Sequence, residues 1–260
     1  MNNPSWVLIT GASTGIGKML ALRFARQGHH LVLVARSADK LSPLSEYISK
    51  QYHVRAIAIP KDLTDSGAPE EIFDLLLEQN IRLDVLINNA GAGQCGLFEN
   101  IDQQKNDQMI DLNIRALTAL TNHAVHHMRR YGGGKILNVA STGSYQPGPY
   151  IAVYYASKAY VLSFTQALRH ELKGSGITVS ALCPGSTATE FSQRAGKADI
   201  KGAMPPQKVA NLAYKGLYKG KAVIIPGLMN KIFIALSKLL PGSLSASIVA
   251  RVQRKLIETF

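Results

Sequence analysis

The feature that most restricts the fold is a regular alternation of two kinds of segment. Short apolar runs rich in β-branched residues recur at residues 6–10, 30–35, 55–60, 83–91, 135–141, 177–185 and 222–227. Longer segments with the spacing of amphipathic helices separate them, such as KMLALRFARQG (18–28) and PEEIFDLLLEQN (69–80). Strands that alternate with helices form parallel sheets covered on both faces. Because the crossovers are right-handed, we predict an α/β fold of the doubly wound (Rossmann) type, with a seven-stranded parallel sheet.

The pattern continues without a division between domains. Apolar residues make up 46% of the 260-residue chain and charged residues 18%, which is typical of a globular protein with a core. Since no repeat, low-complexity tract or Pro/Ser-rich linker interrupts the chain, we predict one domain over residues 1–227 and a C-terminal helical extension over residues 228–260. The polar stretch 186–205 has the length and irregularity of a lid, with a plain surface loop as the alternative.

Cysteine content and the N-terminus bear on the compartment. Cys95 and Cys183 are the two cysteines, and neither has a CxxC partner or a neighbouring histidine in the sequence. A disulfide framework and a zinc site are therefore not expected, which fits a reducing compartment. The apolar run SWVLIT starts within five residues of Met1 without a basic leader, so we expect no removable signal peptide and predict a cytoplasmic protein.

The segment NHAVHHMRR holds a histidine cluster that could resemble a metal site. His123, His126 and His127 have helical spacing near the end of an expected helix, but no carboxylate accompanies them. We therefore predict no metal site, and interpret the cluster as favourable charge at a helix C-terminus or as a surface for a partner helix.

Charge is concentrated near the C-terminus. The chain has a net charge of +12, and from Lys201 onward it holds ten Lys or Arg residues against one acid, Glu258. A basic segment of this kind can meet nucleic acid, a membrane surface or an anionic substrate. Since no zinc-finger spacing, basic zipper or RNP pattern is present, we predict no nucleic-acid partner.

A glycine-rich turn follows the first apolar run. In TGASTGIG (10–17), Gly11, Gly15 and Gly17 would let the backbone turn tightly, approach a pyrophosphate and pack against the sheet. The helix that opens there would offer free N–H groups to the phosphates. The spacing is GxxxGxG, so a tight strand–helix turn without a ligand is the alternative, and the position after the first strand favours dinucleotide binding.

The end of the second run carries information on the type of dinucleotide. Folds that bind NAD often place an acid there to hold the adenosine ribose, but this chain has Ala35, Arg36 and Ser37. A guanidinium suits a 2′-phosphate, so Arg36 favours NADP(H) as the cofactor.

The sequence resembles the short-chain dehydrogenase/reductase family. The matching motifs span about residues 5–190 and are TGASTGIG, Asp62 in KDLTD, NNAG (88–91), Asn113 in DLNI, Ser141 in NVAS, YYASK (154–158) and PGSTAT (184–189). The resemblance implies a catalytic set of Asn113, Ser141, Tyr154 and Lys158. With the turn and Arg36, it implies a cofactor-binding set of Gly11, Ser13, Thr14, Gly15, Ile16, Gly17, Arg36, Asp62, Leu63, Asn89, Ala90, Gly91, Tyr154, Lys158, Pro184, Gly185, Thr187 and Thr189.

The resemblance also implies the chemistry. A hydride passes between the nicotinamide and carbon, while the oxygen exchanges a proton with a tyrosine whose free pKa is about 10. A lysine one helical turn away would lower that pKa by about two units. Ser141 would hydrogen-bond the substrate oxygen, Lys158 would reach the nicotinamide ribose, and Asn113 would hold a water. In this family the helices that carry Asn113 and Tyr154 commonly pack against a second subunit, so a homodimer or homotetramer is expected.

Two adjacent tyrosines compete for the proton-transfer role. Tyr154 lies at i,i+4 from Lys158 and Tyr155 at i,i+3, so both can meet the lysine. The stripe through Tyr154 is otherwise largely apolar, whereas the stripe through Tyr155 runs out to polar residues. A lysine on an apolar stripe needs a reason, and the family pattern YxxxK also selects Tyr154, so we predict Tyr154 as the general acid/base.

The predicted function is therefore NADP(H)-dependent interconversion of a carbonyl and an alcohol. We expect a small, apolar substrate, in a pocket lined by residues 92–98, 142–150 and 186–205, with the tail as a further wall. A dehydratase, epimerase or isomerase could use the same Tyr/Lys pair, and a non-enzymatic NADP-binding sensor or scaffold is the alternative from another class. A sensor or scaffold would be expected to lose proton-transfer residues, and all four are present here.

The tail has its own pattern. Pro241–Gly242 and Lys238 interrupt the apolar stretch 232–250, so we predict no membrane-spanning helix and instead two amphipathic helices over residues 229–240 and 244–257. Basic residues border their apolar positions, as in segments that lie on anionic bilayers. Peripheral membrane contact, a cover over the substrate pocket and a contact with a partner subunit remain alternatives.

Overall fold

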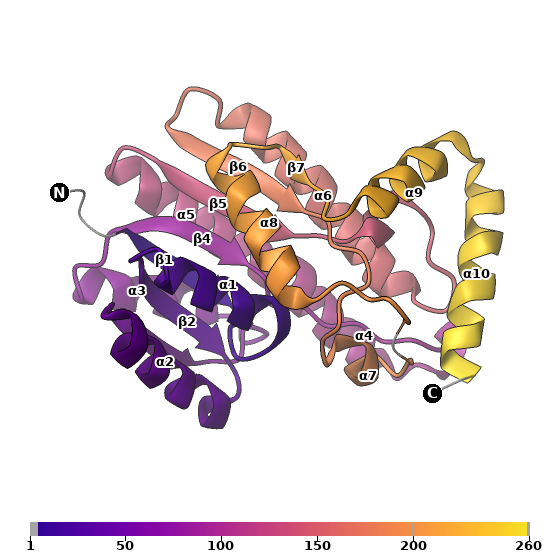
Figure 1. Cartoon of the computed structure of the whole chain (residues 1–260), viewed down its shortest axis with the longest axis horizontal. Helices are drawn as coiled ribbons and strands as arrows, with labels where there is room; N and C mark the ends of the chain where they lie inside the picture. The colour runs from indigo at the N-terminus through magenta and orange to yellow at the C-terminus, as the bar shows by residue number, and fades with distance from the viewer. Residues whose placement is uncertain (1–4, 199, 259–260) are drawn as a thin grey trace.

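The computed structural model describes residues 5–198 and 200–258 (Figure 1). Residues 1–4 and 259–260 of the two predicted ranges, and residue 199 of the predicted lid, lie outside the described part. Within it, seven strands form one sheet in which all neighbours are parallel, in the order β3-β2-β1-β4-β5-β6-β7. The strands are β1 (Trp6–Thr10), β2 (His30–Ala35), β3 (Ala56–Pro60), β4 (Leu83–Asn88), β5 (Gly134–Val139), β6 (Ile177–Leu182) and β7 (Val223–Ile224). This confirms the predicted doubly wound parallel sheet.

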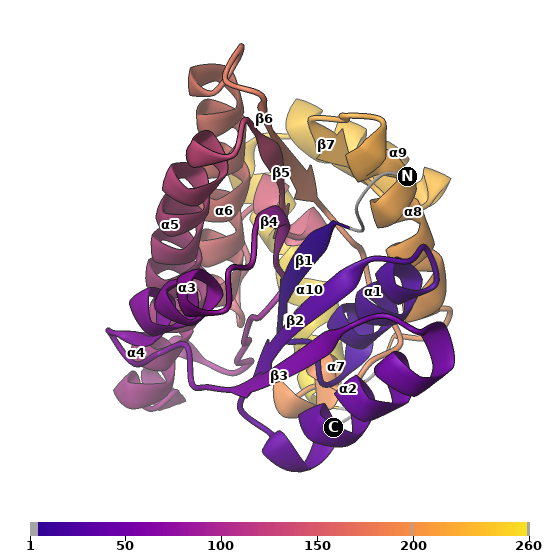
Figure 2. The same cartoon turned by 90° about the vertical axis from the view of Figure 1, so that its left-hand side faces the viewer.

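Helices cover both faces of this sheet, as Figure 2 shows from one end. The long helices are α1 (Gly15–Ala25), α2 (Ala38–Tyr52), α3 (Ala68–Glu78), α5 (Leu117–Arg130), α6 (Ala152–Glu171) and α8 (Pro206–Tyr218). Shorter elements are the 3₁₀ turns η1 (Phe98–Asn100) and η3 (Thr142–Tyr145), the helices α4 (Gln103–Ile110) and α7 (Phe191–Arg194), and the π-helical turn η2 (Asp111–Ala116). Helices α1, α2 and α8 pack on one face, and α3 and α5 pack on the other.

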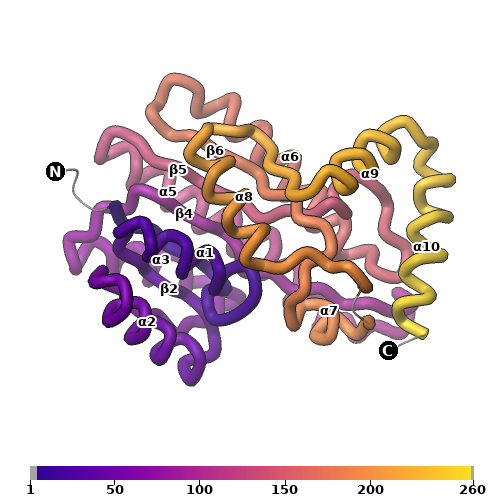
Figure 3. The backbone as a smooth tube through the Cα atoms, in the orientation of Figure 1, coloured from indigo at the N-terminus to yellow at the C-terminus, as the bar shows by residue number. Residues whose placement is uncertain are grey.

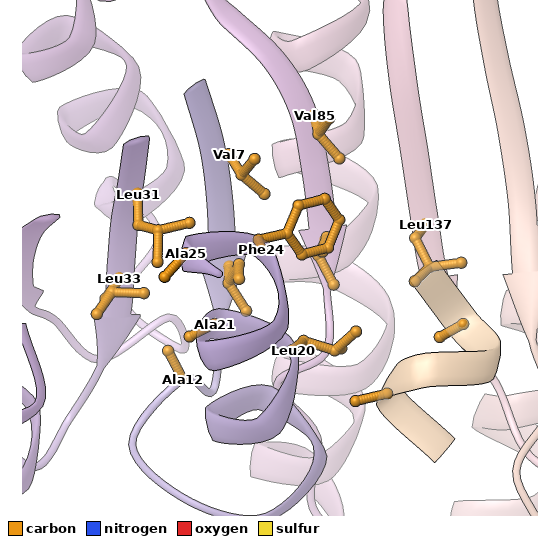
Figure 4. Close-up of a cluster of buried hydrophobic side chains, with 14 of the residues drawn as sticks. Val7, Ala12, Leu20, Ala21, Phe24, Ala25, Leu31, Leu33, Val85 and Leu137 are labelled. Carbon is orange, nitrogen blue, oxygen red and sulfur yellow. The ribbon is translucent and has the colours of Figure 1, made fainter. Parts of the chain in front are cut away.

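The apolar runs are continuous because the central strands are buried on both sides. Along β1, Val7 and Ile9 point into the core beneath α1 and α8, while Trp6 and Leu8 point into the core beneath α3 and α5. Figure 4 shows Phe24 of α1 lying among the side chains of the first core. Fully burying a side chain of this size stabilises the fold by roughly 1.5–3 kcal/mol.

Buried polar side chains also form hydrogen bonds within the core, between strands and helices near the site. Asn88 at the end of β4 donates to Asn138 on β5 and to Thr121 on α5, each at 2.9 Å. Asn138 in turn donates to Thr165 on α6 at 3.0 Å. This buried polar ladder (Asn88, Thr121, Asn138 and Thr165) ties α5 and α6 to the carboxyl ends of β4 and β5.

One member of the histidine cluster, His127, has a different role from the one predicted for the cluster. The ring of His127 is buried and accepts a hydrogen bond from the backbone N–H of Leu83 at 3.1 Å. Burial, with a contribution from the charge of Arg130, lowers the pKa of His127, so the neutral form is favoured. The prediction of a charged histidine at the helix end is therefore wrong for His127, because that ring packs inward.

The tail forms two helices, α9 (Leu228–Leu239) and α10 (Gly242–Glu258), close to the predicted ranges 229–240 and 244–257. They stand at the end of the molecule opposite α2 and α3, as the backbone tube in Figure 3 shows. No helix within the described residues has the length and hydropathy needed to cross a bilayer.

Candidate active site

The site lies where the strand order reverses, between β1 and β4. In open α/β sheets this reversal opens a crevice at the carboxyl ends of the strands. The glycine-rich turn after β1 and the NNAG loop after β4 meet there. Thr10 Oγ1 accepts the backbone N–H groups of Asn89 and Ala90, both at 3.0 Å, and Asn89 Nδ2 donates to the carbonyls of Thr10 at 2.9 Å and Gly11 at 3.1 Å. The side chain of Asn89 therefore braces the turn.

The glycines of the turn are required by the backbone. Gly11 and Gly15 have φ of 63° and 56°, a region that L side chains rarely adopt. A Cβ on Gly17 would lie 2.2 Å from the carbonyl oxygen of Gly11. Thr14 precedes α1 in an extended conformation, and its side chain makes no capping hydrogen bond. The first N–H groups of α1 are thus available to an anion, so the turn fits the pyrophosphate of a dinucleotide.

The residues predicted to hold the adenosine end lie next to each other. Arg36, after β2, is an exposed side chain whose guanidinium is 3.7 Å from the carboxylate of Asp62, after β3. Asp62 also accepts hydrogen bonds from the backbone and hydroxyl of Thr64, both at 2.9 Å. Burial would raise the pKa of Asp62, but the Thr64 hydrogen bonds and the charge of Arg36 hold it below its usual value. Leu63, also predicted as a cofactor contact, packs in the core beneath α3 and α5.

Tyr154 and Lys158 are brought together with Ser141 on the other side of the crevice. Both project from α6, and Lys158 Nζ lies 5.8 Å from the centre of the Tyr154 ring. The side chain of Ser141 hydrogen-bonds the Tyr154 phenol. Gly91 lies close to Lys158, since a Cβ there would be 3.2 Å from Nζ. The structure thus places the NNAG loop, Ser141 and the YxxxK pair around one point.

The pKa values of Tyr154 and Lys158 differ from the sequence prediction. Burial raises the pKa of Tyr154 well above its ordinary value, with a smaller opposing effect from the Ser141 hydrogen bond. Burial also lowers the pKa of Lys158 to about 8, while Nζ donates to the carbonyl of Val139 at 2.8 Å. The expected lowering of the tyrosine pKa by the lysine is therefore not found, because burial dominates the pKa of both groups.

Tyr155 packs against the same buried cluster as Tyr154, and it also contacts the tail. Its ring fills the space beside Gly143 and Gly148, where an added Cβ would lie 2.9 Å and 2.3 Å from ring atoms. Its hydroxyl accepts a hydrogen bond from Gln253 of α10 at 3.3 Å. The two rings have their centres 6.1 Å apart, with Tyr154 beside Ser141 and Tyr155 beside the tail.

Asn113 lies within η2, where the helix from α4 to α5 widens. Its Nδ2 donates to the carbonyl of Ala92 and to Ser157 Oγ, and its Oδ1 accepts the N–H of Ala92, all at 2.9 Å. The amide is fully buried and links the loop after β4 to α6. Its side chain is therefore engaged by the protein on both the donor and the acceptor side. π-helical turns often mark functional positions.

The segment after β6 closes the crevice near the glycine turn. Thr189 lies against Gly15, where a Cβ would be 3.2 Å from the threonine methyl. Thr187 donates to the carbonyl of Gly185 at 3.0 Å, and Pro184 accepts the N–H of Thr142 at 3.0 Å. Gly185 packs against Asn230 of α9. Of the predicted residues in this segment, Thr189 comes closest to the turn.

The loops expected to line the substrate pocket do converge. Cys95 donates its N–H to the carbonyl of Ala195 at 2.8 Å, and Gly96 to that of Tyr150 at 2.9 Å. Phe191 lies with its ring centre 5.2 Å from that of Tyr154. The tail contacts one of these loops, because Arg254 of α10 donates to the Tyr150 hydroxyl at 2.6 Å and 3.0 Å.

Several supporting residues were missed from the sequence. Thr10 anchors two loops, Ser157 fixes Asn113, and Ser144 donates to the carbonyl of Lys158 at 2.7 Å while accepting the N–H of Ser141 at 3.2 Å. Single Ser and Thr residues carry no pattern that distinguishes a bracing hydroxyl from a surface one. For Thr10, the position immediately before the glycine turn was the one available signal.

Known proteins match the chain over most of its length. The sequence profile of the short chain dehydrogenase family matches residues 5–199. A ketoacyl reductase, HetN, from a Nostoc species is 32% identical over 253 residues, which cover 95% of this chain and 88% of that protein.

Solved structures share the arrangement. A short-chain dehydrogenase from Sphingobium yanoikuyae, in complex with NADPH, is 36% identical with a TM-score of 0.81, over 90% of this chain and 94% of that one. A 3-ketoacyl-(acyl-carrier-protein) reductase from Brucella melitensis, complexed with NADH, is 28% identical with a TM-score of 0.77, over 85% of this chain and 96% of that one.

Proposed function

This chain belongs to the short-chain dehydrogenase family, and we propose that it is an NADP(H)-dependent reductase of an apolar carbonyl compound, with Tyr154 as the proton donor. Family membership makes it an oxidoreductase that interconverts carbonyl and alcohol groups with a nicotinamide cofactor. The observation that carries the finer proposal is that Ser141 and Lys158 both lie beside Tyr154, and that Lys158 also lies against Gly91 of the NNAG loop.

The geometry assigns a task to each residue in the reductive direction. A nicotinamide cofactor held at the glycine turn would supply the hydride for the carbonyl carbon. Ser141 and the Tyr154 hydroxyl hydrogen-bond the carbonyl oxygen, and the phenol gives its proton to the oxygen as negative charge develops there. The Tyr154 phenol is protonated at neutral pH, as an ordinary tyrosine is, and burial strengthens its preference for that neutral form. The ammonium group of Lys158 then stabilises the phenolate that is left.

NADP(H) specificity rests on Arg36. Its guanidinium is exposed after β2, where no acid is present to hold a ribose 2′-hydroxyl, and it can bind a 2′-phosphate. Asp62 already attracts it from 3.7 Å. We propose that Arg36 divides its donors between the carboxylate and the phosphate, and that Asp62 orients the guanidinium.

An apolar substrate fits the surroundings of Tyr154. Cys95, Ile151 and Ala195 form a small buried cluster there, and Phe191 and Ile257 pack against it. Such walls exclude water and favour an apolar chain or ring next to the reacting carbonyl. The sensor or scaffold alternative receives no specific support, because the proton-transfer residues are present and are brought together.

A substrate screen tests this proposal. The full-length protein is mixed with NADPH or NADH and with ketones, aldehydes, β-ketoacyl thioesters and ketosteroids, and cofactor oxidation is followed by absorbance. We expect turnover with NADPH on at least one apolar ketone or ketoacyl thioester, and much weaker turnover with NADH. Tight NADPH binding without turnover on any compound class would favour the sensor or scaffold.

A further inference from the structure

Helices α9 and α10 show an unusual distribution of apolar side chains. Among the large hydrophobic side chains exposed on the described residues, half, nine of eighteen, lie within residues 228–252. They are Leu228, Met229, Ile232, Phe233, Leu236, Leu239, Leu244, Ile248 and Val252. Contiguous exposed patches of this kind mark surfaces that meet another apolar surface.

The apolar side of α9 points away from the protein. At 3.6 residues per turn, Leu228, Ile232, Leu236 and Leu239 follow one side of the helix. The opposite side faces the body of the protein, and there Ile234 is buried and Asn230 and Ser237 are half-buried. Ordinary surface helices place the apolar side inward, so α9 is reversed relative to them.

The inner face of helix α10 is packed against the rest of the protein. Ser245, Val249 and Gln253 are buried, and Gln253 donates to Tyr155 beside the candidate site. Leu244, Ile248 and Val252 follow one line, at i, i+4 and i+8, on its exposed part. Figure 1 shows both helices at the same end of the molecule, where their outer sides are free of the sheet and its helices. We call the outward apolar residues of the two helices the arm face.

Charge identifies the class of surface that the arm face fits. The basic residues of the two helices are Lys231, Lys238, Arg251, Arg254 and Lys255, against the single acid Glu258. Lys231 and Arg251 are exposed, and neither joins an ion pair among the described residues. An isologous contact with a second copy would set two such basic faces against each other, which like-charge repulsion disfavours. An anionic lipid surface offers both an apolar layer and negative charge.

We propose that the arm face is a peripheral membrane-binding surface, with the apolar residues of α9 and α10 inserted among the acyl chains of an anionic bilayer and Lys231 and Arg251 at the headgroups. Helix α10 contacts Tyr155 through the buried Gln253 and Tyr150 through the exposed Arg254, so the bound bilayer would lie next to the candidate site. The proposal is independent of the cofactor and of the reaction assigned above.

The test is co-sedimentation of the full-length protein with vesicles. Vesicles of phosphatidylcholine with phosphatidylserine are compared with vesicles of phosphatidylcholine alone, at low and at high salt. We expect binding to the anionic vesicles at low salt, and release as the salt concentration rises.

Two double variants separate the contribution of the apolar side chains to vesicle binding from that of the basic side chains. Ile232→Gln with Leu236→Gln should weaken vesicle partitioning by at least about tenfold for each buried side chain lost. Lys231→Gln with Arg251→Gln should weaken it by about fivefold for each charge removed. The matched controls are Tyr47→Gln with Leu77→Gln, and Lys219→Gln with Lys221→Gln, which change exposed residues outside the tail helices and should bind as the unmodified protein does.

Three results would overturn the proposal. The first is the absence of binding to anionic vesicles at low salt. The second is equal loss of binding in the control variants. The third is a lack of vesicle binding by the unmodified protein, together with a change of oligomeric state in the Ile232/Leu236 variant. Sedimentation velocity measures that state, and the arm face would then be a subunit interface.

Discussion

At the residue scale, burial decides the protonation of the proton-transfer pair. Lys158 is 4% exposed, and its ammonium group has the carbonyl of Val139 as hydrogen-bond partner rather than a carboxylate. Desolvation therefore lowers its pKa to about 8 and raises that of Tyr154. The helical spacing of the pair was evident from YxxxK, but the two shifts were not, because they depend on how many atoms of distant segments surround each group.

The pKa of Lys158 predicts a pH dependence. Below about pH 8 the ammonium form dominates, and above it the neutral amine does, whereas an exposed lysine would remain charged to about pH 10. If the ammonium is the competent form, kcat/KM for NADPH-dependent reduction should fall as the pH rises through about 8. A pH profile of initial rates measures this.

The matched variant for that profile is Lys158→Arg. A guanidinium stays charged above pH 12, so any remaining activity should lose the fall near pH 8. A profile that is flat to pH 10 in the unmodified protein, or a fall at the same pH in the variant, would assign the titration to another group.

Arg36 carries the second residue-scale prediction. Arg36→Ala should weaken NADPH binding by about 1–3 kcal/mol, the usual contribution of charged hydrogen bonds, and leave NADH binding nearly unchanged. Alanine is the cleaner substitution because an aspartate here would lie beside Asp62. Fluorescence titration with both cofactors, with the exposed Arg26→Ala as control, provides the measurement. Equal losses for NADPH and NADH would remove Arg36 from the specificity argument.

At the scale of elements, the site depends on how α5 and α6 are held against the sheet. The seven strands could be predicted because apolar residues on both faces give unbroken runs. Several of these strands were predicted too long, because the chain leaves the sheet where it reaches the site, as after Asn88. The buried polar ladder could not be predicted, since Asn88 and Asn138 look like strand-end residues until their pairing across β4 and β5 is known.

The ladder predicts a large effect on stability. Asn138→Ala removes hydrogen bonds to Asn88 and Thr165 in a buried region, so the free energy of unfolding should fall by about 2–3 kcal/mol. Urea denaturation measures the change. Asn122→Ala, at an exposed position of α5, should alter stability by less than about 0.5 kcal/mol. Similar small effects for both variants would mean that the ladder does not hold the helices.

At the scale of the whole molecule, a rigid sheet carries the site and the two tail helices extend from one end. The tail pattern predicted two amphipathic helices correctly, but it could not show which side faces the protein. In α9 the apolar residues point outward, and the pattern of apolar positions is the same for either orientation. The domain range 1–227, the homo-oligomer and the cytoplasmic location remain predictions.

The tail should exchange its amides faster than the rest of the molecule. Ile234 is the one buried side chain in α9, whereas α6 buries five residues. Local opening should therefore be easier in α9, and hydrogen exchange measured by mass spectrometry should be more than about a hundredfold faster there than in α6. Protection of α9 equal to that of α6, in the protein alone, would show that another protein surface covers it in solution.

The central claim is that Tyr154, and not its neighbour Tyr155, gives the proton to the substrate. With any carbonyl compound that the screen identifies, NADPH oxidation is measured for Tyr154→Phe and for Tyr155→Phe, together with NADPH affinity. Tyr154→Phe should retain NADPH binding and lose turnover by at least about a hundredfold, the usual contribution of general acid catalysis. Tyr155→Phe removes the hydroxyl that Gln253 contacts and should keep most of its activity. The opposite pattern, or full activity in Tyr154→Phe, would contradict the account.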